Sequence, residues 1–292
     1  MDLVHCWPMG SLSTLREARR QKIPSFLERP NAHTRFAFDV VKEENLNIGI
    51  NLPIDHDHTY NSLTLQTEIE EYKTADFLLC PSEFVKTSFI NEGFPKEKLI
   101  RHQYGCDLQQ FVPKETIGTP AFQAIYAGVC EPRKGLHYAL RAWRASRACE
   151  SGKFFICGSF VPGYREKLAS LLDHPSIQYL GHRNDLPEIM GKSNVFILSS
   201  MEEGSALVTY EARASGCVLL VSESTGAIGD HQRNALLHEP RDWQTLAQHL
   251  DQVYLDDLRL TNLRESSLKD RDQLSWTFAG SRLANIYREY IS

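Results

Sequence analysis

The stretch that decides the fold is "NVFILSSMEEGSALVTYEARASG", residues 194–216. An apolar run ends in two glutamates and a glycine, and a helical sequence begins directly afterwards. A strand that enters a glycine loop and then a helix start aims free backbone N–H groups and the positive helix end at one place, which suits a phosphate. The stretch therefore predicts an α/β fold with an anion-binding site.

Two glutamates of this stretch are candidate ligand-binding residues. Glu203 precedes the predicted helix and Glu211 lies inside it, with seven residues between them. Ser205 is expected to cap the helix, which would leave Glu203 in a loop, packed against little and free to reach a ligand. One carboxylate could hold a sugar and the other a ribose, although two glutamates alone are more often part of a solvated face.

This spacing resembles the E-x(7)-E signature of retaining nucleotide-sugar glycosyltransferases, in particular glycosyltransferase family 4 (glycosyl transferases group 1), and the flanking "GKSNVFILSSMEEGSALVTYEARASGCVLLVS" resembles that family too. The resemblance implies the GT-B architecture, an α/β fold of two Rossmann-like doubly wound domains with a cleft between them. The implied reaction is metal-independent transfer of a sugar from a nucleotide diphosphate sugar, such as a UDP or GDP sugar, with retention of configuration. The residues implied at the donor and the reacting sugar are Glu203 as a catalytic residue, with Gly204, Ser205, Ala206, Leu207 and Glu211 as donor contacts.

Composition describes a globular protein without a nucleic-acid partner. The chain has 292 residues, enough for two domains, with 42% hydrophobic and 24% charged residues. Its net charge is −5, and its Lys and Arg residues are scattered, which disfavours binding to a polyanion. The seven cysteines form no C-x-x-C pair and several lie in apolar runs, which indicates reduced thiols and a cytoplasmic location. No apolar run approaches the roughly 18 residues of a membrane span, so any membrane contact is expected to be peripheral.

Alternating strand and helix patterns predict two parallel sheets. Residues 1–117 are expected to form the acceptor-side domain, residues 118–275 the donor-binding domain, and residues 276–292 a helix that the resemblance implies packs back on the first domain. The boundary is placed near Gly118, in the linker "KETIGTP". Strands of the second domain are predicted in "FQAIYAG", "KFFICG", "IQYLG", "NVFILSS" and "CVLLVS".

The first domain is expected to be incomplete, because the chain enters a strand, "DLVHC", at residue 2. Compared with the family, initial strands and a glycine loop are missing. An incomplete sheet is expected to expose apolar surface and to form a homodimer or recruit a partner chain through its edge. This leaves open a second interpretation, a nucleotide-sugar-binding subunit or remnant without turnover of its own.

Two further segments resemble donor-binding segments of the family. In "YAGVCEPRKGLHYALRAW" Lys134 matches the lysine of the family's G-R-x(4)-KG site, while Val129 stands in place of its arginine and Arg133 is expected to substitute. The two cations would grip the donor diphosphate. In "YLGHRNDLPEIM" the main chain around Gly181 and His182 would hold the base, and Asp185 is expected to cap a helix.

On the acceptor side, "IPSFLERPNAHT" resembles the family segment in which a histidine often faces the transferred sugar. His33 is the candidate catalytic residue, with His5 as second choice and Arg29 as a possible acceptor or phosphate contact. The alternating "DHDH" of residues 55–58 lacks a second ligand cluster, so a metal site is rejected and no cofactor is expected. The acceptor, whether a glycan, a lipid or a small molecule, is not predicted.

Overall fold

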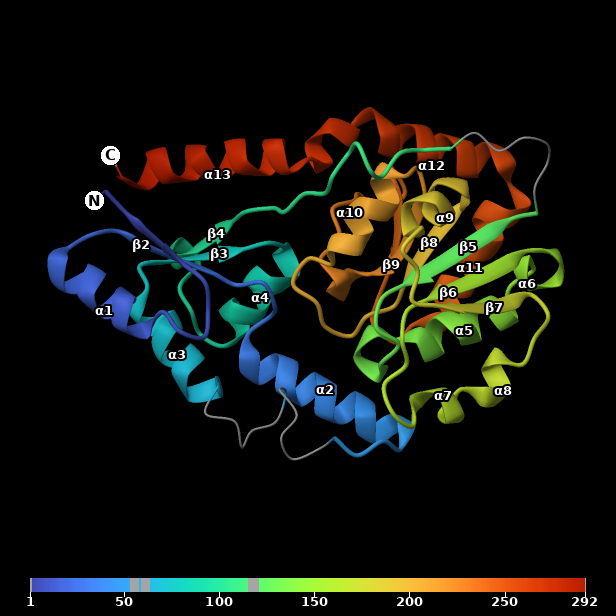
Figure 1. The fold of residues 1–292 in the computed structure, drawn as a ribbon, viewed down its shortest axis with the longest axis horizontal. Coiled ribbons are helices and arrows are strands. Elements are labelled where there is room, and N and C mark those ends of the chain that lie inside the picture. Colours follow the sequence, from blue (N-terminus) through green and yellow to red (C-terminus); the bar gives the residue numbers. More distant parts are fainter. Residues whose placement is uncertain (1, 53–57, 59–63, 115–120, 292) are drawn as a thin grey trace.

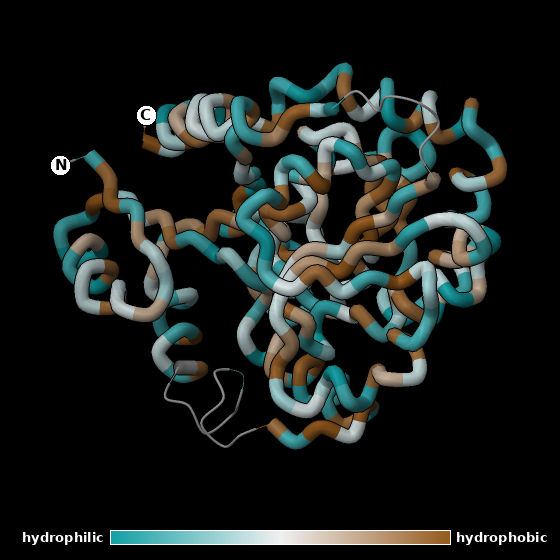
Figure 2. Tube along the Cα trace, turned by 45° about the vertical axis from the view of Figure 1, so that its right-hand side comes forward, coloured by the Kyte–Doolittle hydropathy of each residue, from teal (hydrophilic) through white to brown (hydrophobic). Residues whose placement is uncertain are grey.

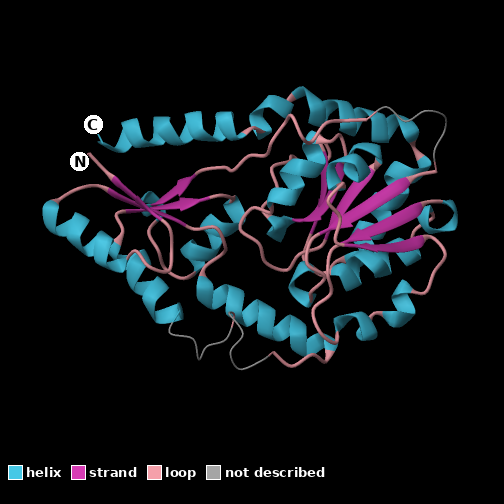
Figure 3. Cartoon of the chain, in the orientation of Figure 1, coloured by secondary structure: helices cyan, strands magenta, loops and turns pink. Residues whose placement is uncertain are grey.

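The computed structural model describes residues 2–52, 58, 64–114 and 121–291. These residues form two parallel β-sheets that lie at opposite ends of an elongated molecule, with helices packed on each (Figures 1 and 3). The predicted boundary near Gly118 lies outside the described residues. Both chain ends lie beside the smaller sheet, because the last helix runs back from the larger domain (Figure 1).

The smaller sheet is built from the first part of the chain. Its four strands, in the spatial order β1-β2-β3-β4, are β1 (Val4–Cys6), β2 (Ser25–Glu28), β3 (Phe77–Cys80) and β4 (Leu99–Arg101). The helices between and beside them are α1 (Leu12–Gln21), α2 (Thr34–Ile48), α3 (Thr64–Thr74) and α4 (Glu83–Asn91). Because the order advances in one direction and such crossovers are right-handed, the connecting helices are directed to one face of the sheet.

The two faces of this sheet are covered by different parts of the chain. Successive strand residues point to opposite faces, so Leu27 lies in a core with side chains of α1, α3 and α4. Its neighbour Phe26 lies in a separate core with Leu283, Ile286 and Tyr287 of α13 (Trp276–Ile291). The face that the crossover helices cannot reach is thus covered by the end of the chain.

The larger sheet has the order β10-β9-β8-β5-β6-β7. Its strands are β5 (Gln123–Ala127), β6 (Lys153–Cys157), β7 (Ile177–Gly181), β8 (Val195–Leu198), β9 (Val218–Ser222) and β10 (Ala235–His238). The order reverses beside β5, so crossover helices lie on both faces, as in Rossmann domains. The strands contain the longest apolar segments of the chain, seen as brown tube in the interior in Figure 2.

The helices of this domain form one layer on each side of the sheet (Figure 1). In one layer α5 packs against α8 and α11, and in the other α10 packs against α9 and α12. They are α5 (Leu136–Ala145), α6 (Ala148–Ser151), α7 (Tyr164–Lys167), α8 (Ala169–Leu172), α9 (Leu186–Lys192), α10 (Leu207–Ala214), α11 (Trp243–Leu255) and α12 (Asp257–Lys269). The five predicted strands are β5 to β9. The prediction did not include β10, a four-residue strand between polar segments.

A buried polar network joins the two domains away from the cleft. Glu44 of α2 has no exposed surface and accepts hydrogen bonds from Tyr138 Oη at 2.8 Å and Arg241 Nε at 3.0 Å. The His137 ring lies 2.9 Å from the same carboxylate. Because Glu44, His137 and Tyr138 are buried and paired with one another, the network fixes α2 against the larger domain.

Two general expectations can be compared with the described residues. All seven cysteines are free and buried, as their apolar surroundings indicated. None of the helices described is both long and apolar enough for a membrane span. The edge strands of the smaller sheet are β1 and β4, each three residues long, and association through an edge stays a prediction.

Candidate functional site

A cavity of about 630 Å³ opens between the two domains. Most of its lining comes from the loops that follow β5, β6, β7 and β8, at the place where the strand order reverses. Pro30 and Asn31, which follow β2, close it from the smaller domain. Ligands of doubly wound sheets bind at this reversal, outside the carboxyl ends of the strands.

Backbone packs closely at this edge of the sheet. Gly158 follows β6 with φ of +146°, and a Cβ there would lie 1.8 Å from the Gly128 carbonyl oxygen. Both glycines line the cavity. A side chain at Gly158 would force β5 and β6 apart at the place where a ligand is expected to lie close to the main chain.

The start of α10 also lines the cavity, through residues 204–207. The residue at the helix cap is Ala206, and the prediction that Ser205 caps the helix is wrong. Ser205 Oγ instead donates to the Gly226 carbonyl at 3.0 Å and bonds with Tyr210 Oη. Ala206 offers no capping side chain, and Leu207 and Val208, the first residues of α10, line the cavity.

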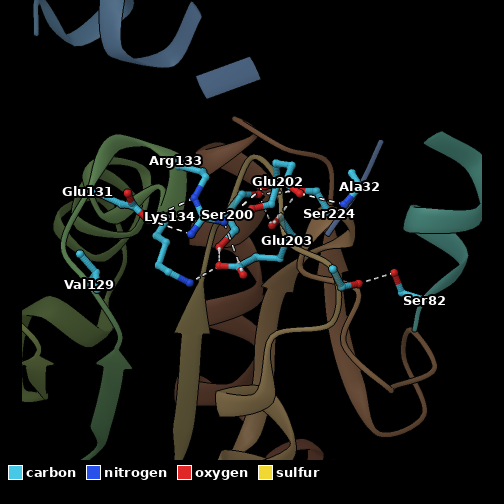
Figure 4. Close-up of polar contacts among 12 residues, drawn as sticks. Ala32, Ser82, Val129, Glu131, Arg133, Lys134, Ser200, Glu202, Glu203 and Ser224 are labelled. Atoms are coloured by element: carbon cyan, nitrogen blue, oxygen red, sulfur yellow. Dashed lines mark hydrogen bonds and ion pairs between the residues drawn. The ribbon is translucent and has the colours of Figure 1, made fainter. Parts of the chain in front are cut away.

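Glu203 is buried, with 8% of its surface exposed, so the expectation that it contacts little is wrong. Lys134 Nζ donates to its carboxylate, Arg133 Nη1 lies 3.6 Å away and Ser200 Oγ 3.4 Å away (Figure 4). Burial raises the pKa of Glu203, but Arg133 and Lys134 outweigh it and hold the pKa below its ordinary value. Glu203 is therefore a charged group at the cavity wall, already in contact with cations.

The neighbouring Glu202 was not predicted as a site residue. It has no exposed surface, and its Oε1 accepts a hydrogen bond at 3.0 Å from the backbone N–H of Ala32 in the smaller domain. Arg133 Nη1 lies 3.3 Å from its Oε2. Burial outweighs Arg133 here and raises the pKa of Glu202, whereas the pKa of Glu203 is lowered. The pair of adjacent glutamates was the sequence signal that could have identified Glu202. The Glu203 carboxylate lies at the cavity, and the Glu202 carboxylate joins the two domains.

Backbone contacts reinforce this junction. A Cβ on Gly204 would lie 1.3 Å from the Pro30 carbonyl oxygen, so only glycine permits this approach. Ser82, which follows β3, donates to the Gly204 carbonyl (Figure 4) and also caps α4. The loop before α10 is therefore held from both domains.

The two adjacent cations have different surroundings. Arg133 donates to Glu131 at 2.9 and 3.1 Å and to the Glu202 carbonyl oxygen at 2.9 Å, and it does not line the cavity. Lys134 does line it. The expectation that both cations face the donor is therefore wrong for Arg133, because three acidic side chains surround its guanidinium. Val129, which replaces the family arginine, lines the cavity.

The loop after β7 contributes His182 to the cavity lining. Gly181 lies at the end of β7, where its carbonyl accepts the Gly158 N–H at 2.8 Å, and it does not line the cavity. Asp185 makes no helix-capping hydrogen bond, contrary to expectation. Its carboxylate instead accepts from Arg183 at 2.6 and 2.7 Å.

Glu211 is half-buried on α10, four residues after Leu207 and on the same face of the helix. Leu207 lines the cavity, whereas Glu211 lies one turn beyond it. Within the described part of the chain its carboxylate has no hydrogen-bond or ion-pair partner, and burial raises its pKa.

His33 does not lie at the cavity. Its side chain is buried against the rings of Tyr72, Phe89 and Phe94, with centroid distances of 5.1–5.8 Å. Burial and the nearby Arg29 lower its pKa to about 4. The expectation that His33 faces the transferred sugar is thus not met by its position, because the chain turns into α2 at this residue and directs the ring into the core.

Arg29 is also enclosed. Its guanidinium bonds with Glu68 at 3.1 Å and lies 4.3 Å from the centroid of the Tyr72 ring, with 2% of the residue exposed. It therefore stabilises the smaller domain and is not available for an acceptor or a phosphate.

Metal ligation was rejected from the sequence. Asp55, His56 and Asp57 lie outside the described residues, so the structure says nothing of that loop. In the rest of the chain that the structure describes, no group of three or more His, Cys, Asp or Glu side chains is arranged to hold a metal ion.

Comparison with known proteins covers both sequence and structure. Residues 121–256 match the family described as "Glycosyl transferases group 1". O-antigen chain mannosyltransferase B of Escherichia coli is 23% identical over 240 residues, which are 75% of this chain and 62% of that protein. D-inositol 3-phosphate glycosyltransferase of Corynebacterium kroppenstedtii is 26% identical over 98% of this chain and 66% of its own length. The chain thus spans just under two thirds of these relatives.

The fold is shared with solved structures. The Anabaena protein HepE, in a complex with UDP-glucose, has a TM-score of 0.72 at 16% identity, covering 99% of this chain and 79% of its own. A match of this extent includes both sheets and the cleft between them. The chain therefore has the GT-B fold, and its residues 121–256 match the glycosyl transferases group 1 family.

Proposed function

We propose that this protein transfers a glycosyl group from a UDP-sugar to an acceptor hydroxyl, with retention of configuration and without a metal ion. The observation that carries the proposal is the cavity at the strand reversal, where the uncapped start of α10 and the Lys134 ammonium meet. Both features stabilise the charge that develops on a diphosphate leaving group. The UDP-glucose bound to HepE, which has the same fold, supports this choice of donor.

Glu203 and Lys134 have linked roles in this proposal. Their ion pair lies in the cavity wall, so an incoming diphosphate competes with Glu203 for the ammonium. Lys134 then neutralises the phosphates, and the Glu203 carboxylate becomes an acceptor for hydroxyls of the transferred sugar. The low pKa of Glu203 keeps it ionised for that contact.

Glu211 is assigned to the ribose. A half-buried carboxylate without a partner gains most from a ligand that donates two hydrogen bonds, and ribose hydroxyls do so. The base is assigned to the main chain of the loop that begins after Gly181, where His182 lines the cavity.

A second candidate function is binding of a nucleotide sugar without turnover. Two observations favour it: Arg133 is held by Glu131 and Glu202, so Lys134 alone faces the cavity from this turn, and the candidate His33 lies in the core. Such a protein would serve as a subunit or remnant beside a complete transferase.

The test separates binding from turnover. Thermal shifts with UDP, GDP, ADP and UDP-glucose report binding, because a ligand of the native state raises the melting temperature. Release of UDP from UDP-glucose, with and without EDTA, reports turnover. We expect the largest thermal shift with UDP and UDP-glucose, and UDP release that EDTA does not change. Binding without release would support the second candidate, and no thermal shift with any nucleotide would rule out both.

A further inference from the structure

Helix α2 of the smaller domain begins beside the cavity and ends on the larger domain (Figure 1). The backbone N–H of Ala32, two residues before the helix, donates at 3.0 Å to Glu202 in the loop after β8. At the other end, Ile48 and Ile50 pack against the hydrophobic core of the larger domain. The helix is therefore fixed to the larger domain at both ends.

Between these ends, α2 packs against the short helical turn Pro132–Lys134, whose last residue lines the cavity. The segment after β8 packs against the same turn. A Cβ at Gly135 would lie 1.8 Å from the Ser199 carbonyl oxygen, and the Met201 N–H donates to the Arg133 carbonyl at 2.7 Å. The backbone of this turn is therefore held by the end of β8 and by α2 together.

Glu44 of α2 contacts the helix that follows this turn. Its carboxylate has no exposed surface and lies 2.9 Å from His137 Nε2, in the first turn of α5. His137 Nδ1 in turn lies 2.7 Å from Tyr164 Oη at the start of α7. Burial raises the pKa of Glu44, but hydrogen bonds from His137 and Tyr138 outweigh it and hold the pKa below its ordinary value. An ionised carboxylate carries no proton, so His137 Nε2 is the donor in this bond.

Neither Glu44 nor His137 lines the cavity, so any influence on a ligand there is indirect. A carboxylate that lost its charge would leave the His137 and Tyr138 donors poorly paired, and buried donors without good partners are costly. Relief of that cost moves α2 relative to the start of α5, which follows Lys134 by two residues. A change at Glu44 is therefore transmitted through the backbone to Lys134.

We propose that Glu44 is a positioning residue of the donor site, an assignment that rests on the proposed transferase function. The bond between Glu44 and His137 fixes the start of α5 against α2, and this fixes the Lys134 ammonium where the donor diphosphate binds. The smaller domain thus contributes to diphosphate binding through a helix that does not line the cavity. Because the base is assigned to the loop after β7, Glu44 should influence binding of the phosphates and not of the nucleoside.

The test compares UDP and uridine binding to the full chain by calorimetry. Glu44→Gln keeps the size of the side chain and removes its charge. It should weaken UDP binding about tenfold, part of the contribution of a charged hydrogen bond from Lys134, and leave uridine binding unchanged. Glu71→Gln is the matched control, because Glu71 also has no exposed surface and accepts three hydrogen bonds, from the backbone N–H groups of residues 9–11 in the smaller domain. This variant should bind both ligands as the unsubstituted chain does.

A double variant distinguishes a positioning role from a purely structural one. In a Lys134→Met chain the ammonium is absent, so adding Glu44→Gln should weaken UDP binding no further, whereas a general loosening of the domain would weaken it again. Arg241→Met gives a second answer if Glu44→Gln does not fold, because Arg241 is 40% exposed and donates to Glu44 at 3.0 Å. It should weaken UDP binding about threefold, as for a partly exposed ion pair, and leave uridine binding unchanged.

The assignment would be overturned by equal losses of UDP and uridine affinity, by additive losses in the double variant, or by an unchanged UDP affinity in Arg241→Met and Glu44→Gln. Loss of UDP affinity in Glu71→Gln would overturn it too, because any buried carboxylate would then have the same effect. The proposed function fails separately: an unsubstituted chain that bound no UDP would overturn the donor site itself, and the role of Glu44 with it.

Discussion

The two sheets differ in which parts of the chain cover their two faces. In the larger sheet the strand order reverses beside β5, so crossover helices cover both faces and the reversal itself opens the cavity. In the smaller sheet the order advances in one direction, and the second face is covered by α13 from the other end of the chain. The larger domain's side of the cavity is thus built from local loops, whereas the smaller domain depends on a helix about 270 residues away in sequence.

The strand-end carboxylates differ in the same way. Glu203 is paired with the cationic side chains of Lys134 and Arg133. Glu28 is paired with two histidines and bonded by Tyr104. The larger domain thus holds its strand-end carboxylate with cationic side chains, while the smaller domain holds its own with imidazole rings and a phenol.

The largest expected effect concerns the donor side. Glu203→Ala should abolish UDP release from UDP-glucose and destabilise the fold by about 3–5 kcal/mol, because it leaves a buried cation without its carboxylate. Denaturant unfolding and the release assay measure the two effects. Glu203→Gln, which keeps the shape, should recover part of the stability. Full activity in either variant would show that Glu203 has no role in the reaction.

The next effect distinguishes the two adjacent cations. Lys134→Met should weaken UDP binding by about 1.5–3 kcal/mol, the usual contribution of a charged hydrogen bond, with little effect on uridine. Arg133→Met should instead lower stability more than UDP affinity, since Arg133 binds Glu131 and Glu202. Calorimetry with UDP and uridine measures the affinity of each variant, and denaturant unfolding measures its stability. Similar results for the two variants would contradict the different positions of these side chains.

Glu211 gives a smaller change on the same side. Glu211→Gln should weaken UDP about tenfold, as expected for one charged hydrogen bond to ribose. Because burial raises the pKa of Glu211 and a hydroxyl donor stabilises its ionised form, the affinity of the unsubstituted protein for UDP should rise as pH increases through that pKa. A Kd for UDP that is the same in both proteins would remove Glu211 from the site.

The smaller domain should respond to a change in α13. Ile286→Ala in α13 should lower stability by about 1–2 kcal/mol, less than for a fully buried isoleucine, because Ile286 is only partly buried against Phe26. UDP affinity should not change. Leu260→Ala on α12 is the matched control, a partly buried aliphatic residue packed on the larger domain. Loss of UDP affinity in Ile286→Ala but not in the control would mean that the donor site also depends on this helix.

The smallest effect is a change in pH dependence. The pKa of His33 is lowered to about 4 from 6.5, so between these values the unfolded chain binds a proton that the folded ring excludes. Stability should therefore fall as pH decreases through this window. His33→Phe should make that decrease shallower, with a change at pH 7 within about 1 kcal/mol. Denaturant unfolding of both proteins at pH 7, 6 and 5 measures the free energy of unfolding. If this free energy fell equally with pH in both proteins, the lowered pKa would not belong to His33.

The sequence by itself predicted the parts of this protein that depend on local patterns. Apolar runs followed by glycine and helix signals placed the strands from β5 to β9, and residues 204–207 lie at the cavity where the loop pattern put them. The strand β10 was missed, since four residues carry too little periodicity.

Tertiary structure decided what depends on partners distant in sequence. Lys134 and Arg133 are adjacent and alike in charge. Their roles differ because Arg133 is bound by Glu131 and Glu202, whereas Lys134 lines the cavity. His33 is buried because Tyr72 and Phe89, some forty and fifty-six residues further along, surround it. A pocket beside Glu28 exists because α13 returns across the smaller sheet. Local patterns fix the backbone through short-range hydrogen bonding, but burial and charge pairing, which determine what a side chain can do, are set by contacts that the sequence does not display.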